Sequence, residues 1–199
     1  MSRPTARAEL TSKRHGPLVR VDVRSAAART GMLRLGGLTF PCALGRGGCR
    51  VLKREGDGAT PVGRFLLRKV LYRPDRVPRP RTRLPVVRLG KDAGWCDAPE
   101  DRNYNRPVRL PYAARAERLW RADRHYDVLV VLDYNERPRV RHRGSAIFLH
   151  VAHTDLAPTD GCIALARAHL LRVLAHLKRG ARLCVPAQAR PRTARARHG

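Results

Sequence analysis

Residues 147–165 have the sequence IFLHVAHTDLAPTDGCIAL, and this stretch decides both the expected fold and the expected site. The apolar run from Ser145 to Val151 predicts a buried strand that holds His150 in a fixed position. Cys162 follows twelve residues after that histidine and stands directly behind Gly161. A cysteine attacks as the thiolate, and a nearby imidazole is the usual means of forming a thiolate near neutral pH. The stretch therefore predicts an acyl-transfer site with Cys162 as nucleophile and His150 as base.

The loop before the cysteine, formed by Thr159, Asp160 and Gly161, predicts the place where an oxyanion is held. Glycine lets backbone amides come close to the group that the sulfur attacks, and such amides are typical oxyanion donors. The sequence PTDG is also common in ordinary turns, and the two interpretations are compatible. Asp160 either shapes this turn or lies beside the sulfur, where its negative charge would oppose thiolate formation.

Two other interpretations of these residues remain open at the level of sequence. A buried cysteine or histidine is often a plain core residue. His150, His153, Asp155 and Cys162 are also ligand types that zinc prefers. Two histidines three residues apart at the end of a strand point to opposite faces of the sheet, which argues against joint ligation. We therefore expect no metal and no cofactor.

The motif resembles the signature of the L,D-transpeptidase (YkuD-like) catalytic domain family. In that signature a histidine is followed, after a spacer, by Ser or Thr, any residue or His, then Gly, Cys and an apolar residue. His150, Thr159, Gly161, Cys162 and Ile163 stand at the corresponding positions.

Two further segments carry the resemblance. The sequence KREGDGATPVGRF at residues 53–65 resembles the family's Thr-Pro-x-Gly-x-Phe segment, for which we expect a structural role. The sequences WCD at 95–97 and NYNR at 103–106 resemble a segment of one proteobacterial branch. The resemblance extends from Leu18 to Pro186.

The resemblance implies an activity, a substrate and a location. The expected activity is the cross-linking of peptidoglycan stem peptides through a cysteine acyl-enzyme formed at a diaminopimelate carbonyl. The expected location is the periplasm or cell envelope, with roles in cell-wall biogenesis and cell shape. A cysteine peptidase or carboxypeptidase acting on muropeptides would use the same pair of residues and remains an alternative.

A cluster of polar and aromatic residues in a loop punctuated by Pro and Gly is expected to bind the substrate. Its members are Trp95, Asp97, Asn103, Tyr104 and Asn105. Binding loops on rigid scaffolds have this composition, and so do many inert surface loops.

Two positions depart from the family's pattern. Asp160 stands where many members have a second histidine. Ala164 stands where many members have an arginine thought to hold a substrate carboxylate. Arg167 is the nearest arginine that would take over that role.

Short apolar runs separated by Gly and Pro predict a mainly β, sandwich-like domain over residues 17–187, with one main helix after the Gly-Cys loop. Basic arms at 1–16 and 188–199 are expected to be disordered. The expected strands are 18–23, the hairpin 32–35 and 38–43, then 64–72, 127–134, 145–151 and 182–185. We expect the main helix at 166–178, a short helix at 112–120, and an irregular Pro-rich loop at 74–85.

The net charge of +26, almost all from arginine, has two interpretations. It attracts a polyanion, either peptidoglycan or nucleic acid, or it only spreads arginine over every solvated face. Aromatic residues that stack on bases are scarce at 5%, so a nucleic-acid partner is not expected. The alternative from another class is a non-catalytic basic module that binds nucleic acid or wall polymer.

Five cysteines form no CxxC pair. Cys42 and Cys49 either bridge a short loop in an oxidising compartment or are buried unpaired thiols. No segment reaches the ~18 consecutive apolar residues that a membrane-spanning helix needs. Residues 1–15 are polar and basic, so no secretory signal is visible, in contrast to the envelope location that the resemblance implies.

Overall fold

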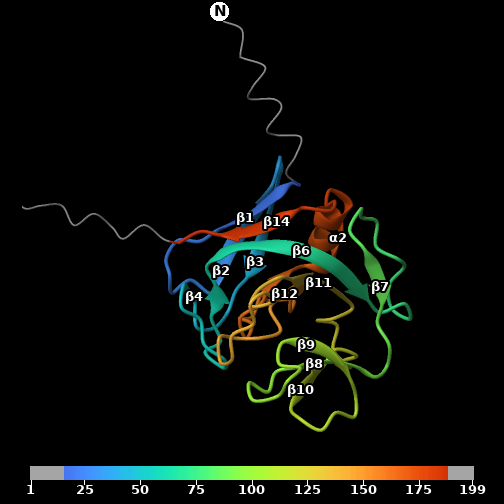
Figure 1. The fold of residues 1–199 in the computed structure, drawn as a ribbon. Helices are drawn as coiled ribbons and strands as arrows, with labels where there is room; N and C mark the ends of the chain where they lie inside the picture. Colours follow the sequence, from blue (N-terminus) through green and yellow to red (C-terminus); the bar gives the residue numbers. More distant parts are fainter. Residues whose placement is uncertain (1–15, 188–199) are drawn as a thin grey trace, which may run out of the picture.

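Strand β11 (Val128–Leu132) hydrogen-bonds to a neighbour on each edge, and this closes the main sheet into a barrel (Figure 1). The computed structural model describes residues 16–187. Around the barrel β11 is followed by β12 (Phe148–Val151), β13 (Ile163–Leu165), β3 (Leu38–Ala43), β2 (Thr30–Leu35), β1 (Leu18–Asp22), β14 (Arg182–Val185) and β6 (Gly63–Tyr72), which pairs again with β11. The β12–β13 and β1–β14 pairs are parallel, whereas the other pairs of the barrel are antiparallel.

The side chains of β11 point alternately to its two faces and belong to two apolar clusters. Val128, Val130 and Leu132 belong to the cluster inside the barrel, whereas Leu129 and Val131 belong to a second cluster on its outer face. Side chains of a strand point alternately to opposite faces, so a strand that is covered on both sides is apolar throughout. All five residues of β11 are buried for this reason.

The same alternation places the candidate base. Leu149 and Val151 of β12 face the barrel interior, and Phe148 belongs to the outer cluster. His150 therefore lies on the outer face, the face to which Cys162 also contributes its side chain.

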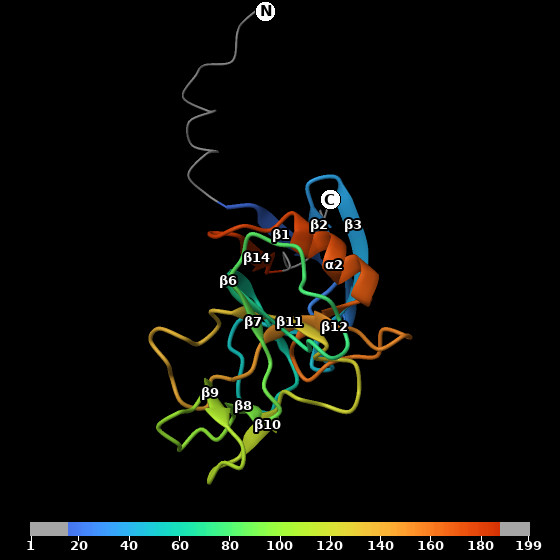
Figure 2. The same cartoon turned by 90° about the vertical axis from the view of Figure 1, so that its right-hand side faces the viewer.

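A small three-stranded sheet covers this outer face and lies beside the barrel in both views (Figures 1 and 2). It consists of β8 (Ala93–Cys96), β9 (Arg106–Arg109) and β10 (Ala116–Arg118). Trp95 from β8 and Leu119 after β10 pack into the outer cluster with Phe148 of the barrel. Three short strands complete the sheets: β4 (Cys49–Arg50) pairs with β5 (Thr60–Pro61), and β7 (Val86–Arg88) pairs in parallel with β6.

Helix α2 (Arg167–Ala175) follows the Gly-Cys loop and contributes to the barrel interior. Leu170, Val173 and Leu174 are its buried residues, and they belong to the same cluster as the inward-facing strand residues. The spacing of these residues puts them on one face of the helix.

The mainly β class with one helix after the Gly-Cys loop is confirmed for residues 16–187. The layers of the expected sandwich are opposite walls of one closed barrel. The hairpin of β2 and β3, the strands corresponding to β1, β6, β11, β12 and β14, and the helix α2 all lie where the sequence predicted them.

The short helix expected at 112–120 is wrong. Residues 116–118 form strand β10, which pairs with β8 in antiparallel register. The alanine-rich segment favours a helix intrinsically, but intrinsic propensity is a weak effect and a short isolated helix is marginal in water. Pairing with β8 and burial of Leu119 outweigh it.

Other expectations concern the ends of the chain, the cysteines and membrane spanning. The two basic arms lie outside the described residues, except for Gly16. All five cysteines are unpaired. Cys42 and Cys49 are buried free thiols and do not form the bridge that was the other alternative. None of the helices within residues 16–187 has the length and apolar character needed to cross a bilayer.

Candidate active site

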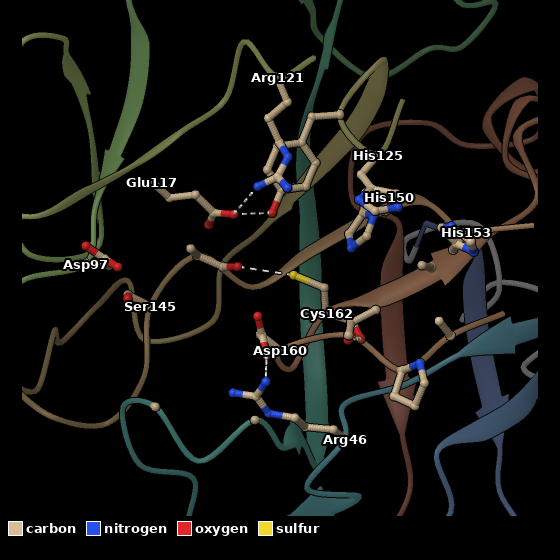
Figure 3. Close-up of a pocket in the computed structure, with 18 of the residues that line it drawn as sticks. Arg46, Asp97, Glu117, Arg121, His125, Ser145, His150, His153, Asp160 and Cys162 are labelled. Atoms are coloured by element: carbon tan, nitrogen blue, oxygen red, sulfur yellow. Dashed lines mark hydrogen bonds and ion pairs between the residues drawn. The ribbon is translucent and has the colours of Figure 1, made fainter. Parts of the chain in front are cut away.

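A pocket of about 610 Å³ lies where the outer barrel face, the small sheet and the loops between them meet (Figure 3). Cys162 and His150 both line this pocket. The parallel pairing of β12 with β13 brings them together, because Leu149 is opposite Ile163, the residue next to the cysteine. Folding thus places the expected nucleophile and the expected base in one cavity.

The sulfur of Cys162 is held by the backbone of the segment that leads into β12. The Phe148 N–H donates to Sγ at 3.3 Å, and the thiol donates to the Ala146 carbonyl oxygen at 3.2 Å. Burial, and after it the negative charge of Glu117, raise the pKa of the Cys162 thiol to about 12, while the Phe148 N–H and Lys53 act in the opposite direction. The thiol is therefore neutral in the resting site.

His150 is fixed in the tautomer that a base requires. Its Nδ1 lies 2.9 Å from the Val151 carbonyl oxygen, and a carbonyl only accepts, so Nδ1 carries the proton and Nε2 has a free lone pair. The ring packs edge-on against Tyr126 at 5.2 Å between centroids. Burial lowers the pKa of His150 to about 4, and the imidazole is neutral near pH 7.

The resting pair is thus a neutral thiol beside a neutral imidazole, not the thiolate–imidazolium pair that the sequence motif suggests. Both shifts have burial as their largest cause, because low dielectric disfavours each charged form. A neutral thiol and a neutral imidazole in one pocket are suited to proton transfer during attack on a carbonyl, not before it.

The loop 159–161 is locked beneath the sulfur. The Thr159 hydroxyl donates to the Cys162 carbonyl oxygen at 2.7 Å and accepts from the Gly161 N–H at 3.2 Å. Gly161 has φ +127°, and a Cβ at this position would lie 2.7 Å from the Ala59 carbonyl oxygen, so only glycine fits. Because the Gly161 N–H is engaged within the loop, the Cys162 N–H is the better oxyanion donor. It makes no hydrogen bond with any of residues 16–187.

Asp160 lines the same pocket as Cys162, and its side chain is 79% exposed. The carboxylate forms an ion pair with Arg46 at 2.9 Å. Its negative charge is among the smaller causes that raise the pKa of the Cys162 thiol, and the pair with Arg46 partly offsets that charge.

Of the residues expected to bind substrate, Asp97 lines the pocket. Its Oδ2 lies 3.1 Å from Nε of Arg115, whereas its buried Oδ1 has no hydrogen-bond partner among the described residues. Few buried acceptors in folded proteins lack a donor, so Asp97 is an unusual residue of this pocket.

The other members of that loop support the site from behind and do not line the pocket. The indole N–H of Trp95 donates to Oδ1 of Asn105 at 2.9 Å, and the same oxygen accepts from the Ala146 N–H at 3.1 Å. Tyr104 donates to Glu55, and Asn103 donates to the Tyr112 hydroxyl. Direct substrate contact by these residues stays an untested prediction.

Arg167 is not brought to the nucleophile. It is exposed at the start of α2 and lines a second pocket of about 600 Å³ that does not include Cys162 or His150. Ala164 lines the catalytic pocket without an arginine in its place.

Several pocket residues escaped prediction from the sequence. Glu117 and Tyr126 form a hydrogen bond of 2.6 Å, and the Arg121 guanidinium lies over the Tyr126 ring, 3.7 Å from Glu117 (Figure 3). Arg46 also lines the pocket and belongs to a segment far from the motif. One feature of the sequence could have pointed to Glu117. The chain has 16 acidic residues against 42 basic ones, so each acidic residue within the folded domain is notable.

The zinc interpretation has no support in the geometry. His153 forms an ion pair with Asp155 at 2.7 Å, and the His125 ring packs against both His150 and His153. Within the described part of the chain, no group of three or more His, Cys, Asp or Glu residues is arranged to hold a metal ion.

Comparison with known proteins identifies one family. The family described as YkuD, the L,D-transpeptidase catalytic domain, matches residues 19–185. No curated protein and no solved structure matches the chain.

Proposed function

Because the chain belongs to the YkuD L,D-transpeptidase catalytic domain family, which acts on peptidoglycan, we propose that it cross-links stem peptides through a thioester on Cys162. The observation that carries this proposal is the shared pocket of Cys162 and His150, with the His150 tautomer fixed by the Val151 carbonyl. A purely structural cysteine and histidine would need neither a common cavity nor a free Nε2.

In the first half-reaction, Cys162 Sγ attacks the carbonyl carbon of a diaminopimelate residue in a donor stem while its proton passes to Nε2 of His150. The Cys162 N–H donates to the oxyanion. The tetrahedral intermediate then collapses, the C–N bond breaks, and the imidazolium returns the proton to the departing amine of the downstream D-residue. A thioester and a free amine result.

In the second half-reaction, the amine of an acceptor stem attacks the thioester and His150 takes its proton. The C–S bond breaks, the new amide forms, and the sulfur recovers a proton from the imidazolium. Water in place of the amine would release a shortened stem, which is the carboxypeptidase alternative. The cavity around a buried sulfur favours either enzyme over a non-catalytic basic module.

We further propose that the enzyme works in the cell envelope, in cell-wall biogenesis and cell shape, and that it belongs to a proteobacterial branch of the family. These statements rest on the family and on the segments at 95–97 and 103–106.

The test is product analysis by mass spectrometry after incubation of the chain with purified tetrapeptide muropeptides. We expect cross-linked dimers and one released D-amino acid per bond. Cys162→Ser and His150→Ala should each lower the rate by roughly a thousandfold or more. Shortened stems without dimers would make the protein a carboxypeptidase, and unchanged muropeptides with the wild-type chain would refute the proposed function.

A further inference from the structure

The wall of the catalytic pocket opposite the barrel carries two carboxylates, Glu117 from β10 and Asp97 from the end of β8. Both line the cavity that contains Cys162 (Figure 3). Their negative charges act on each other, since Asp97 is among the groups that disfavour ionisation of Glu117. The small sheet therefore places two neighbouring acids in front of the nucleophile.

Each of these carboxylates has an oxygen that lacks a donor. Glu117 uses Oε1 to accept from the Tyr126 hydroxyl, and its Oε2 accepts no hydrogen bond from any described residue. Asp97 uses Oδ2 in its pair with Arg115, and its buried Oδ1 has no partner within residues 16–187. The buried Asp97 Oδ1 carries a desolvation cost, whereas Glu117 Oε2 is an acceptor that a ligand with N–H donors can use.

The arginines of the pocket do not meet this need. Arg121 donates to both carboxylate oxygens of Asp123, at 2.6 to 3.0 Å, and its contact with Glu117 is longer, at 3.7 Å. Arg46 is paired with Asp160. Arg115 pairs with Asp97 and Arg121 lies near Glu117, so this wall of the pocket carries both signs of charge, yet no arginine of the described residues hydrogen-bonds to Glu117 Oε2 or Asp97 Oδ1.

From this geometry we infer that Glu117, together with Asp97, binds a primary ammonium group at the end of a side chain of the donor peptide. An ammonium group has three donors and one positive charge, so it can donate to Glu117 Oε2, while the negative charge of the nearby Asp97 adds to the attraction. A diamino acid next to the scissile bond has this chemistry. The inference rests on the proposed function, because it assigns a specificity residue to that same reaction.

Ammonium binding also acts on the thiol. The charge of Glu117 is the second-largest cause of the raised pKa of Cys162, after burial. A bound ammonium group neutralises that charge, lowers the pKa of the thiol and eases proton transfer to His150. Binding of the correct donor peptide therefore makes the thiolate of Cys162 easier to form.

Two donor peptides test the inference. One has a side chain that ends in a primary ammonium group, and in the other a hydroxyl replaces the amine. The rate of thioester formation on Cys162 is followed by intact-protein mass spectrometry after acid quench. We expect the wild-type protein to prefer the ammonium donor by about tenfold to a hundredfold, as for a hydrogen-bonded charge pair.

Glu117→Gln should abolish this preference, and Asp97→Asn should reduce it. The glutamine keeps an acceptor for Tyr126, and circular dichroism with thermal unfolding shows whether the variant is folded. Glu100→Gln is the matched control, since it removes one negative charge from a carboxylate that is 72% exposed and does not line the pocket. It should keep the wild-type preference.

Equal rates with both donors in the wild type, or a preference that survives in Glu117→Gln, would overturn the inference and leave the proposed function intact. No thioester with either donor in the wild-type protein would instead remove the proposed function, and the inference with it. The two failures are thereby distinguished.

Discussion

At the scale of single residues, burial is the main influence on the protonation of Cys162 and His150. Cys162 and His150 are both held by backbone groups, the Phe148 N–H and the Val151 carbonyl oxygen. Backbone contacts orient these side chains without adding a charge, so burial dominates both pKa shifts.

The pKa of His150 has a consequence for stability. Its ordinary value is 6.5 and its value in the folded chain is about 4. Between these values the unfolded chain binds a proton at this imidazole and the folded chain does not, so stability falls as the pH falls. We expect this group alone to remove about 3 kcal/mol of unfolding free energy across the interval.

Urea unfolding between pH 6.5 and about pH 4 measures this effect, with His150→Gln as the reference that lacks the titrating group. The wild type should lose more stability than the variant over that range. Parallel losses in the two proteins would show that burial does not hold the imidazole neutral.

Asn105 is a second residue whose effect can be measured. Its amide donates to the carbonyl oxygens of Tyr134 and Asn135, and its Oδ1 accepts from Trp95 and from the Ala146 N–H. Asn105→Ala leaves these buried groups unpaired, and we expect a loss of about 3 kcal/mol in unfolding free energy.

Because the Ala146 carbonyl accepts from the thiol, Asn105→Ala should also slow acylation of Cys162 in protein that is still folded. Asn103→Ala is the control, since its amide donates to the Tyr112 hydroxyl outside the pocket. Chemical denaturation and the acylation assay together check both effects. Equal losses in the two variants would contradict a positioning role for Asn105.

At the scale of elements, the parallel pair β12–β13 and the Gly-Cys loop between them form the frame of the site. The loop must turn tightly to return the chain beside β12, and Gly161 makes this possible at φ +127°. Any side chain here meets the Ala59 carbonyl oxygen and adopts an unfavourable backbone conformation.

We therefore expect Gly161→Ala to lower the unfolding free energy by about 2–3 kcal/mol and to reduce acylation at least tenfold. Gly37→Ala is the matched control, because a Cβ at that hairpin position meets nothing within 4 Å. Thermal unfolding and thioester formation are the two measurements. A Gly161→Ala protein as stable and as active as Gly37→Ala would show that the loop has room to relax.

The elements also show where sequence-based prediction succeeds and where it fails. β11 and β12 were predictable because strands buried on both faces are apolar throughout, and α2 because its leucines recur at helical spacing. β10 was not predictable, since its strand conformation depends on pairing with β8, which is distant in sequence. Glu117 on that strand was missed for the same reason, whereas His150 and Cys162 stand within one local motif.

At the scale of the whole molecule, many arginines of the outer surface differ from those of the pocket in whether they are paired with carboxylates. The net charge is +26, yet the arginines that line the catalytic pocket are paired with carboxylates. Unpaired surface arginines attract a polyanion over a distance set by the salt concentration, whereas close ion pairs in a cavity are screened much less.

This contrast predicts different salt dependences for a polymer and for a small substrate. Raising the salt concentration from about 0.05 M to about 0.3 M shortens the Debye length by more than about twofold, so we expect binding to intact peptidoglycan to weaken by at least tenfold. The kcat/KM for a soluble stem peptide should change by no more than about twofold, because its recognition occurs inside the pocket. Sedimentation with purified sacculi measures the first quantity and muropeptide turnover the second. A steep salt dependence in both would mean that exposed arginines, rather than the pocket, recognise the stem peptide.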